Sequence, residues 1–160
     1  MMKRTITILG IIFLMIACKE SPRQISLSEE LTDFDHVNVI LMIGDGMGIA
    51  QLQSGIMASD MPMNITKFKH IGFQNTKPAD GDITDSAASG TAMATGTKTY
   101  NGRLGIDTSG QELKTILEYA EEAGLSTGLV STSSITHATP ASFIAHEMDR
   151  DEYEAIARDF

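Results

Sequence analysis

The chain of 160 residues carries a formal net charge of −9, because 12 Lys and Arg stand against 21 Asp and Glu. This length suits one domain, and 42% hydrophobic with 21% charged residues is too apolar a mixture for a disordered chain. The acidic balance argues against sequence-independent nucleic-acid binding, which needs a basic surface. A single cysteine excludes an internal disulfide framework and a zinc site made of cysteines.

The first residues have the pattern of an export signal. Basic residues precede an apolar run over 6–17, which is shorter than the roughly 20 residues that span a bilayer. The run ends at Cys18 and resembles the lipobox of bacterial lipoproteins, with Met15 in place of the usual Leu. We expect a lipoprotein-type signal over 1–18, a polar tether over 19–35, and an exported chain held at a membrane in the periplasm or on the cell surface. An ordinary signal peptide with an incidental thiol is the alternative.

Apolar segments alternate with helical patterns over residues 36–160, which we interpret as one domain. Nearly continuous apolar or β-branched runs predict strands at 37–43, 71–76 and 125–131. Strands that alternate with helices predict an α/β fold with a mainly parallel sheet flanked by helices.

Capping patterns predict the helices between these strands. Their expected positions are Gly48 to about Ala58, 86–95, Ser109 (capping box with Glu112) to Gly124, a start at Thr139 with Pro140 in the first position, and Asp149 to Phe160. The last helix has no capping glycine or polar tail. We therefore expect the chain to be the N-terminal part of a longer protein.

A glycine-rich turn, Gly44–Gly48, follows the first predicted strand. Ligands of α/β proteins bind at the carboxyl ends of parallel strands, so the turn is well placed for a site. Its glycine spacing differs from the dinucleotide-binding pattern, and Asp45 would repel a pyrophosphate. A carboxylate there can hold a hard cation, and a solvated aspartate in a tight turn is the alternative.

Asp85 and Ser86 begin the small-residue helix at 86–95. Asp85 can cap this helix and leave the Ser86 hydroxyl in the first turn, where free N–H groups and the helix dipole favour an anion. The pattern predicts a hydroxyl at a phosphate-binding helix end, and a capped helix of small residues is the alternative.

Two later segments contain further candidate residues. Thr139 is predicted as an N-cap, and His137 beside it can equally be a loop or packing histidine. Arg150 is predicted in the first turn of the last helix, where a cation opposes the dipole. Such exceptions to local rules are expected at functional sites, and Arg suits bidentate recognition of phosphate. The two flanking aspartates can instead neutralise it.

Taken in order, these segments resemble the alkaline phosphatase family. The matching stretches are 43–48, 84–88, 96–102 and 139–141, followed by Arg150. Together they cover nearly all of the chain after its tether, and four linked motifs are specific where each alone is weak. The resemblance implies a three-layer sandwich with a mainly parallel sheet, incomplete at the C-terminus.

The resemblance also implies hydrolysis of small phosphate monoesters through a phosphoserine, with two Zn²⁺ and one Mg²⁺. Ser86 would be the nucleophile, Asp45 would bridge the magnesium and one zinc, Thr139 would bind magnesium, and Arg150 would hold the phosphate. His137 stands where bacterial members often have Asp, so its contact with magnesium is either direct or through water. A homodimer is a further expectation.

Most zinc ligands of that family have no counterpart among the four histidines of this chain. We therefore expect residues 36–160 to hold the nucleophile half of the site and to have little activity alone. Two alternatives stay open: a lipid-anchored, non-catalytic fragment that binds phosphate weakly, and a phosphodiesterase or sulfatase relative of the same superfamily. The pattern Asp85-Ser86-Ala87 argues against a sulfatase.

Overall fold

The computed structural model describes residues 38–160. The chain divides into two compact units, residues 1–42 and residues 43–160, and the helices below all belong to the second. The predicted signal, Cys18 and the tether lie outside the described residues. Within 38–160, the helices are too short or too polar to cross a membrane.

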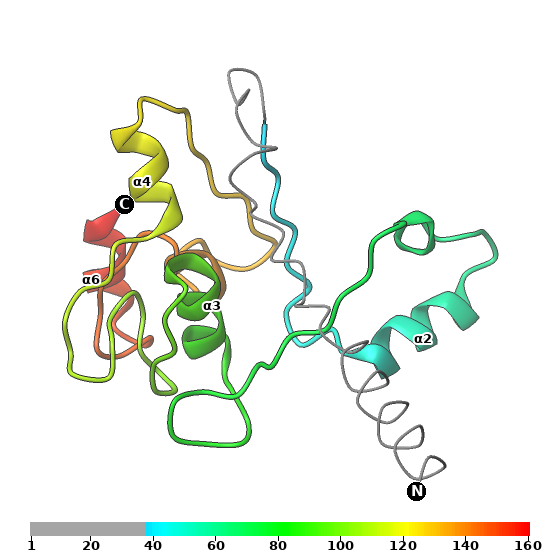
Figure 1. Ribbon diagram of the computed structural model, residues 1–160, viewed down its shortest axis with the longest axis horizontal. Coiled ribbons are helices and arrows are strands. Elements are labelled where there is room, and N and C mark those ends of the chain that lie inside the picture. The colour runs from blue at the N-terminus through cyan, green and yellow to red at the C-terminus, as the bar shows by residue number, and fades with distance from the viewer. Residues whose placement is uncertain (1–37) are drawn as a thin grey trace, which may run out of the picture. The chain divides into compact units, whose positions relative to one another are not determined.

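The helices of the described residues are short and are joined by long irregular segments (Figure 1). Their order is α2 (Ile49–Ala58), the 3₁₀ helix η1 (Asn64–Lys67), α3 (Ser86–Thr95), α4 (Ile116–Glu122), α5 (Ala138–Ala141) and α6 (Tyr153–Asp159). The helices predicted at 49–58 and 86–95 are confirmed. The second has a local cap at each end, whereas the first has no side-chain cap.

Helix α3 carries the chemistry-bearing residue Ser86 at its first position. Asp85 caps the helix by accepting the backbone N–H of Ala88 at 2.8 Å, and Gly96 ends it in the left-handed conformation. A Cβ atom at Gly90 would lie 2.6 Å from the Ser142 hydroxyl oxygen. The absence of that atom lets α3 pack closely against the segment that follows α5.

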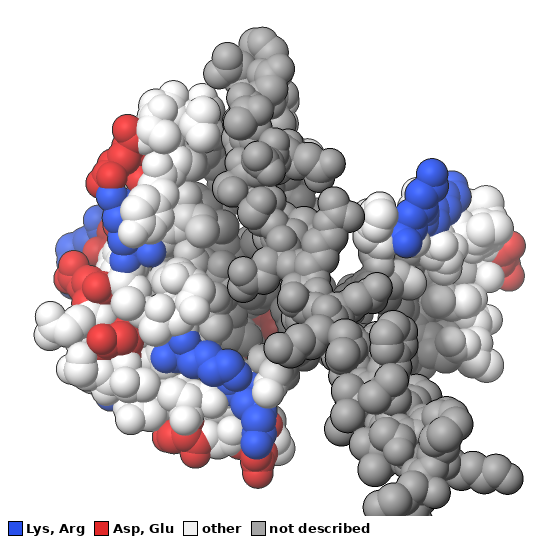
Figure 2. All heavy atoms as spheres, in the orientation of Figure 1, with Lys and Arg blue, Asp and Glu red and all other residues white. Residues whose placement is uncertain are grey.

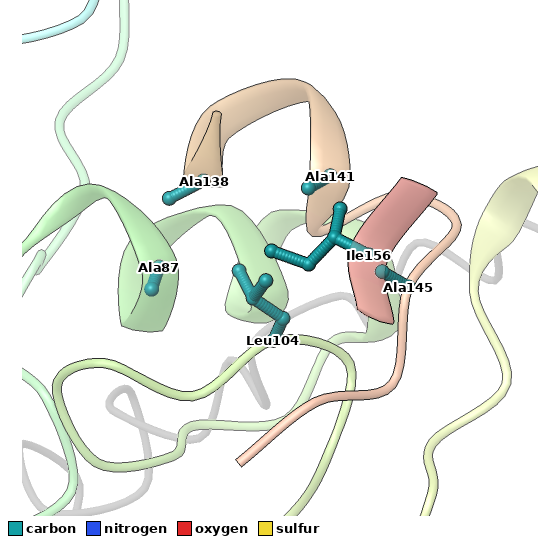
Figure 3. Packing of buried hydrophobic residues seen from close by; sticks show 6 residues of the cluster. All are labelled: Ala87, Leu104, Ala138, Ala141, Ala145 and Ile156. Carbon is teal, nitrogen blue, oxygen red and sulfur yellow. The ribbon is translucent and has the colours of Figure 1, made fainter. Parts of the chain in front are cut away.

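A small apolar core joins α3 to α5 and α6 (Figure 3). Alanines at its contacts let the helix backbones approach closely, whereas Leu104 and Ile156 supply most of the buried volume. The cluster consists of Ala87, Leu104, Ala138, Ala141, Ala145 and Ile156. It holds the start of α3 against residues more than 50 positions later in the chain.

The predicted strands do not form in the described residues. Only isolated bridges occur there, between Leu104 and Glu147 and between Ile106 and Glu112. The segments 38–43, 71–76 and 125–131 are irregular and largely exposed to solvent. A strand of a parallel sheet needs hydrogen-bonding neighbours and covered faces. Residues 38–160 do not supply them, so the predicted mainly parallel sheet is not seen in this part of the chain.

The helix predicted from Ser109 begins later than expected. One carboxylate oxygen of Asp107 accepts the backbone N–H and the hydroxyl of Ser109, each at 2.7 Å, and the N–H of Gln111 at 2.9 Å. These bonds, that of Gln111 first, lower the pKa of Asp107. Ser109 therefore belongs to a turn, and Glu112 lies at an isolated bridge.

Helix α4 uses a second capping box six residues further along. The Thr115 hydroxyl accepts the N–H of Glu118, and the Glu118 carboxylate accepts the N–H of Thr115. Thr115 is fully buried and donates its hydroxyl to the Phe143 carbonyl at 2.8 Å. That long-range bond selects this box over the one predicted at 109–112.

The predicted N-cap at Thr139 is wrong. His137 occupies the N-cap position of α5, so Thr139 lies within the helix and its hydroxyl is free for another partner. The prediction that Arg150 lies in the first turn of the last helix is also wrong, because α6 begins at Tyr153 with Glu152 as N-cap. Arg150 therefore precedes the helix and does not oppose its dipole.

Charged side chains of both signs are interspersed on the face drawn in Figure 2. Two ion pairs on the surface join Lys77 to Asp82 and Lys114 to Glu122. Exposed pairs of this kind contribute little to stability.

Two buried threonines form a matched pair for a test of stability. The Thr91 hydroxyl donates to the Arg103 carbonyl at 3.1 Å and accepts the N–H of Gly105 at 2.9 Å. The Thr99 hydroxyl has no partner within the described residues although it is buried. We expect Thr91→Val to lower the free energy of unfolding by about 2 kcal/mol and Thr99→Val to leave it unchanged or raise it. Urea unfolding checks this, and equal losses would contradict it.

Candidate active site

Three oxygen-bearing side chains from distant parts of the chain meet at the start of α3. The Ser86 hydroxyl donates to the Asp45 carboxylate and lies 3.1 Å from each of its oxygens. The Thr139 hydroxyl donates to the same carboxylate at 2.9 Å. Asp45 therefore accepts hydrogen bonds from the two hydroxyls that the sequence marked as candidates.

The turn before α2 presents the Asp45 carboxylate. The backbone N–H of Met47 donates to the Gly44 carbonyl at 3.1 Å, and Gly46 has a φ of 66°. This left-handed conformation is available to glycine at little cost, so the chain reverses immediately after Asp45.

Arg150 is held beside Ser86 through Asp85. The guanidinium donates to Asp85 Oδ2 at 3.0 Å, and both side chains are about three-quarters buried. The same carboxylate caps α3 through Ala88. Because Asp85 directly precedes Ser86, this ion pair ties Arg150 to the start of the helix that carries the hydroxyl.

The role of Asp85 as partner of Arg150 was not predicted from the sequence. The capping pattern predicted Asp85 only as a helix cap, and the aspartates flanking Arg150 were the expected neutralising partners. The actual partner lies 65 positions away. The signal that could have found it was Arg150 itself, a cation without a local structural reason, next to a motif that already contained a carboxylate.

His137 makes no side-chain hydrogen bond within the described residues, and its backbone N–H donates to the Ser134 carbonyl at 3.0 Å. It is partly exposed and lies two residues before Thr139. The structure thus brings together Asp45, Ser86 and Thr139, joins Arg150 to them through Asp85, and leaves the His137 side chain uncommitted.

The arrangement has the donor chemistry of a site for a hard cation. One carboxylate and two hydroxyl oxygens converge, and oxygen ligands are those that Mg²⁺ prefers, while Zn²⁺ also accepts carboxylate. Among residues 38–160, no cluster of three or more His, Cys, Asp or Glu side chains could hold a metal ion. A cation here would therefore rely on the hydroxyls as well as on Asp45.

Comparison with known proteins identifies the family. The family model described as alkaline phosphatase matches residues 36–159. The chain belongs to the alkaline phosphatase family. The resemblance inferred from the motifs is thereby confirmed, and it extends over the whole of the described site.

Several curated alkaline phosphatases are similar to this chain. Alkaline phosphatase 4 of Bacillus subtilis (strain 168) is 48% identical over 132 residues, which cover 77% of this chain. The alkaline phosphatase of Escherichia coli (strain K12) is 39% identical over 138 residues, or 80% of this chain. The matched region spans only 29% of the length of each of these relatives.

Solved alkaline phosphatase structures share the fold of the described part. The enzyme of the Antarctic bacterium TAB5 matches with a TM-score of 0.70 and 44% identity, covering 72% of this chain and 34% of that enzyme. Two variants of that enzyme, in which a histidine is replaced by Asp or Glu, have Mg bound in the M3 site. The chain therefore has an alkaline-phosphatase-like fold.

Proposed function

We propose that the protein is a metal-dependent phosphatase that hydrolyses small phosphate monoesters through a phosphoserine at Ser86. The observation that carries this proposal is the Ser86 hydroxyl at a helix N-terminus, where it donates to the Asp45 carboxylate and directly follows the aspartate that holds Arg150. Because the matched relatives are more than three times as long as the matched region, the proposal concerns a molecule in which the alkaline phosphatase fold is complete.

The nucleophile is Ser86. Its oxygen attacks the phosphorus of the ester, the bond from phosphorus to the alcohol oxygen breaks, and the phosphoryl group is transferred to the serine. The serine proton is lost to solvent water, and the departing alcohol oxygen takes up a proton from water. Water then hydrolyses the phosphoserine, which releases inorganic phosphate and restores the hydroxyl. Asp45 orients the hydroxyl before the attack, since it accepts the serine proton in a hydrogen bond.

Positive charge around the nucleophile holds the phosphoryl oxygens. Arg150 can bind two of them at once through its planar guanidinium, which Asp85 keeps in place. The first turn of α3 adds backbone N–H groups and the positive end of the helix dipole. Both interactions grow stronger as charge builds up on these oxygens in the transition state.

Asp45 and Thr139 are proposed metal ligands, with His137 beside them. The convergent oxygens of Asp45, Ser86 and Thr139 fit divalent cations, and the Mg bound in the M3 site of the TAB5 variants supports a metal cofactor. Two Zn²⁺ and one Mg²⁺ are the set that the family resemblance implies. When bound, such cations would lower the pKa of the serine hydroxyl and stabilise negative charge on the leaving oxygen.

The remaining expectations from the sequence stay proposals. The exposed apolar segments 38–43, 71–76 and 125–131 would become strands of a mainly parallel sheet when the fold is complete, which the match to whole alkaline phosphatase structures supports. Export, a lipid anchor on Cys18 and a homodimer rest on the sequence pattern and the resemblance alone.

Acid-quenched mass spectrometry tests the proposed intermediate. The metal-loaded protein is incubated with inorganic phosphate at low pH, quenched and digested, and fragment ions locate any added phosphate. We expect the adduct on Ser86 and none on Ser89, which lies on the same helix. Turnover of p-nitrophenyl phosphate without an adduct on Ser86 would reject the phosphoserine. A protein without turnover would support the alternative of a non-catalytic phosphate binder.

Replacement of Asp45 by asparagine tests the proposed metal site. Asp45→Asn removes the negative charge but keeps the shape of the side chain. We therefore expect the affinity of the protein for Zn²⁺ or Mg²⁺ to fall at least about tenfold. Asp82→Asn is the control, because Asp82 pairs with Lys77 on the surface. Metal analysis after dialysis gives the readout. Unchanged metal content in Asp45→Asn would assign this residue to the turn alone.

A further inference from the structure

A two-residue turn, Asn101–Gly102, contacts both the segment that precedes the proposed nucleophile and the backbone of Arg150. It lies in the stretch 96–102, which contributed to the family resemblance but received no role there. The contacts of these two residues are with main-chain and carboxylate groups that hold Ser86 and Arg150, not with those two side chains themselves.

Asn101 secures the segment that leads into Ser86. Its Oδ1 accepts the backbone N–H of Asp85 at 2.9 Å, and its Nδ2 donates to the Ile83 carbonyl at 3.0 Å. Both ends of the side-chain amide are thus used on a segment three residues long. This pairing fixes where α3 begins, and with it where the Ser86 hydroxyl lies.

Gly102 binds both the Asp85 carboxylate and the backbone of Arg150. Its N–H donates to Asp85 Oδ2 at 2.9 Å, and its carbonyl accepts the backbone N–H of Arg150 at 2.8 Å. Gly102 has a φ of 85°, and a Cβ atom there would meet nothing within 4 Å. The glycine is therefore needed for its backbone conformation and not for space.

We propose that the Asn101–Gly102 turn sets the position of Arg150 relative to Ser86, and that Asn101 is a positioning residue for phosphoryl transfer. This proposal rests on the proposed function. Asp85 has one carboxylate oxygen shared by Arg150 and Gly102, while its backbone N–H is held by Asn101. Loss of Asn101 frees the Asp85 backbone, and the guanidinium moves with the carboxylate that holds it.

The test pairs each substitution in the turn with the same substitution at a position outside the turn. Asn101→Ala has Asn75→Ala as its control, because the Asn75 side chain makes a single hydrogen bond within the described residues, from the N–H of Lys77, in an exposed segment. Gly102→Ala has Gly96→Ala as its control, since both glycines have positive φ and open space around a Cβ atom. The controls carry the same loss of an amide or the same backbone strain without the proposed role.

Kinetics of the metal-loaded protein give the first readout. We expect Asn101→Ala and Gly102→Ala to lower kcat for p-nitrophenyl phosphate by about 10- to 100-fold, because a misplaced reacting group costs rate of that order. The inhibition constant of inorganic phosphate should rise by a similar factor, since Arg150 would bind the phosphoryl group of the substrate and free phosphate alike. The two controls should stay within about twofold of the unaltered protein.

Amide hydrogen exchange gives a second readout that does not need activity. Exchange at the Arg150 amide should quicken at least about tenfold in Asn101→Ala, although Asn101 does not contact Arg150. If the unaltered protein shows no turnover, the proposed function fails. The exchange rate of the Arg150 amide still shows whether Asn101 positions Arg150. If Asn101→Ala does not fold, Asn101→Asp replaces it in the same measurements. This variant keeps an acceptor for the Asp85 N–H but loses the donor to the Ile83 carbonyl. An active protein in which these variants match their controls in rate, phosphate inhibition and exchange would overturn the proposal.

Discussion

Replacing Ser86 with alanine is expected to lower kcat/KM for p-nitrophenyl phosphate at least about 1,000-fold, equivalent to about 4 kcal/mol of barrier. The change removes the atom that we propose as the nucleophile, and the hydroxyl of Ser89, one turn later, is bound to the Asp85 carbonyl. Folding should be little affected, because the Ser86 hydroxyl donates to a partly hydrated carboxylate and not to the core. Steady-state kinetics and a urea unfolding curve measure the two effects separately.

Ser89→Ala is the matched control. Ser89 lies one turn further along α3 and donates its hydroxyl to the Asp85 carbonyl at 2.7 Å, so it shares the helix and the residue type but does not face Asp45. Its rate should stay within about threefold of the unaltered protein. Normal turnover in Ser86→Ala would refute the nucleophile assignment, whereas equal losses in both variants would point to damage of the helix.

Replacing Gly105 with alanine is expected to cause a large loss of stability, about 4 kcal/mol or more. An added Cβ atom would lie 2.2 Å from the Ala145 carbonyl oxygen, and φ at this residue is 58°. The clash is with backbone, which cannot rotate away, and the neighbouring bridge between Leu104 and Glu147 holds both segments in place. Since a typical domain is stable by only 5–15 kcal/mol, urea or thermal unfolding should show a much lower midpoint.

Gly110→Ala separates the clash from the strain. Gly110 also has a positive φ, but a Cβ atom there would meet only the Met148 sulfur at 3.7 Å, an ordinary contact. Its loss should be about 1–2 kcal/mol, the cost of the left-handed conformation alone. If Gly105→Ala lost no more than Gly110→Ala, the close approach between residues 105 and 145 would not exist in solution.

Local chemistry made part of this structure predictable. The cap at Asp85, the position of Ser86 in the first turn and the helix end at Gly96 follow from groups that interact within four residues. The predicted box at Ser109 had the same local pattern as the true one at Thr115. Local pattern could not choose between them, because the choice depends on the bond from Thr115 to the distant Phe143 carbonyl.

The apolar runs were a less reliable guide than the caps. The run at 38–43 has the composition of a buried strand, yet it is irregular and exposed in the structure. The composition of a segment indicates whether it can be buried in a sheet. A strand forms only where neighbouring strands bind its backbone N–H and C=O groups. Segments 71–76 and 125–131 show the same difference between pattern and structure.

The sequence alone therefore determined the start of α3, the glycine turn at Asp45, the family and the candidate residues. Only the tertiary structure showed that Thr139, 94 positions from Asp45, shares its carboxylate with Ser86, and that Asp85, not a neighbouring aspartate, neutralises Arg150. Hydrogen bonds between residues so far apart depend on the packing of α3 against α5, which alanines and Gly90 permit but do not specify by any periodic pattern. The candidate site residues could be recognised in short motifs, whereas the distances between them depend on the core that holds those motifs together.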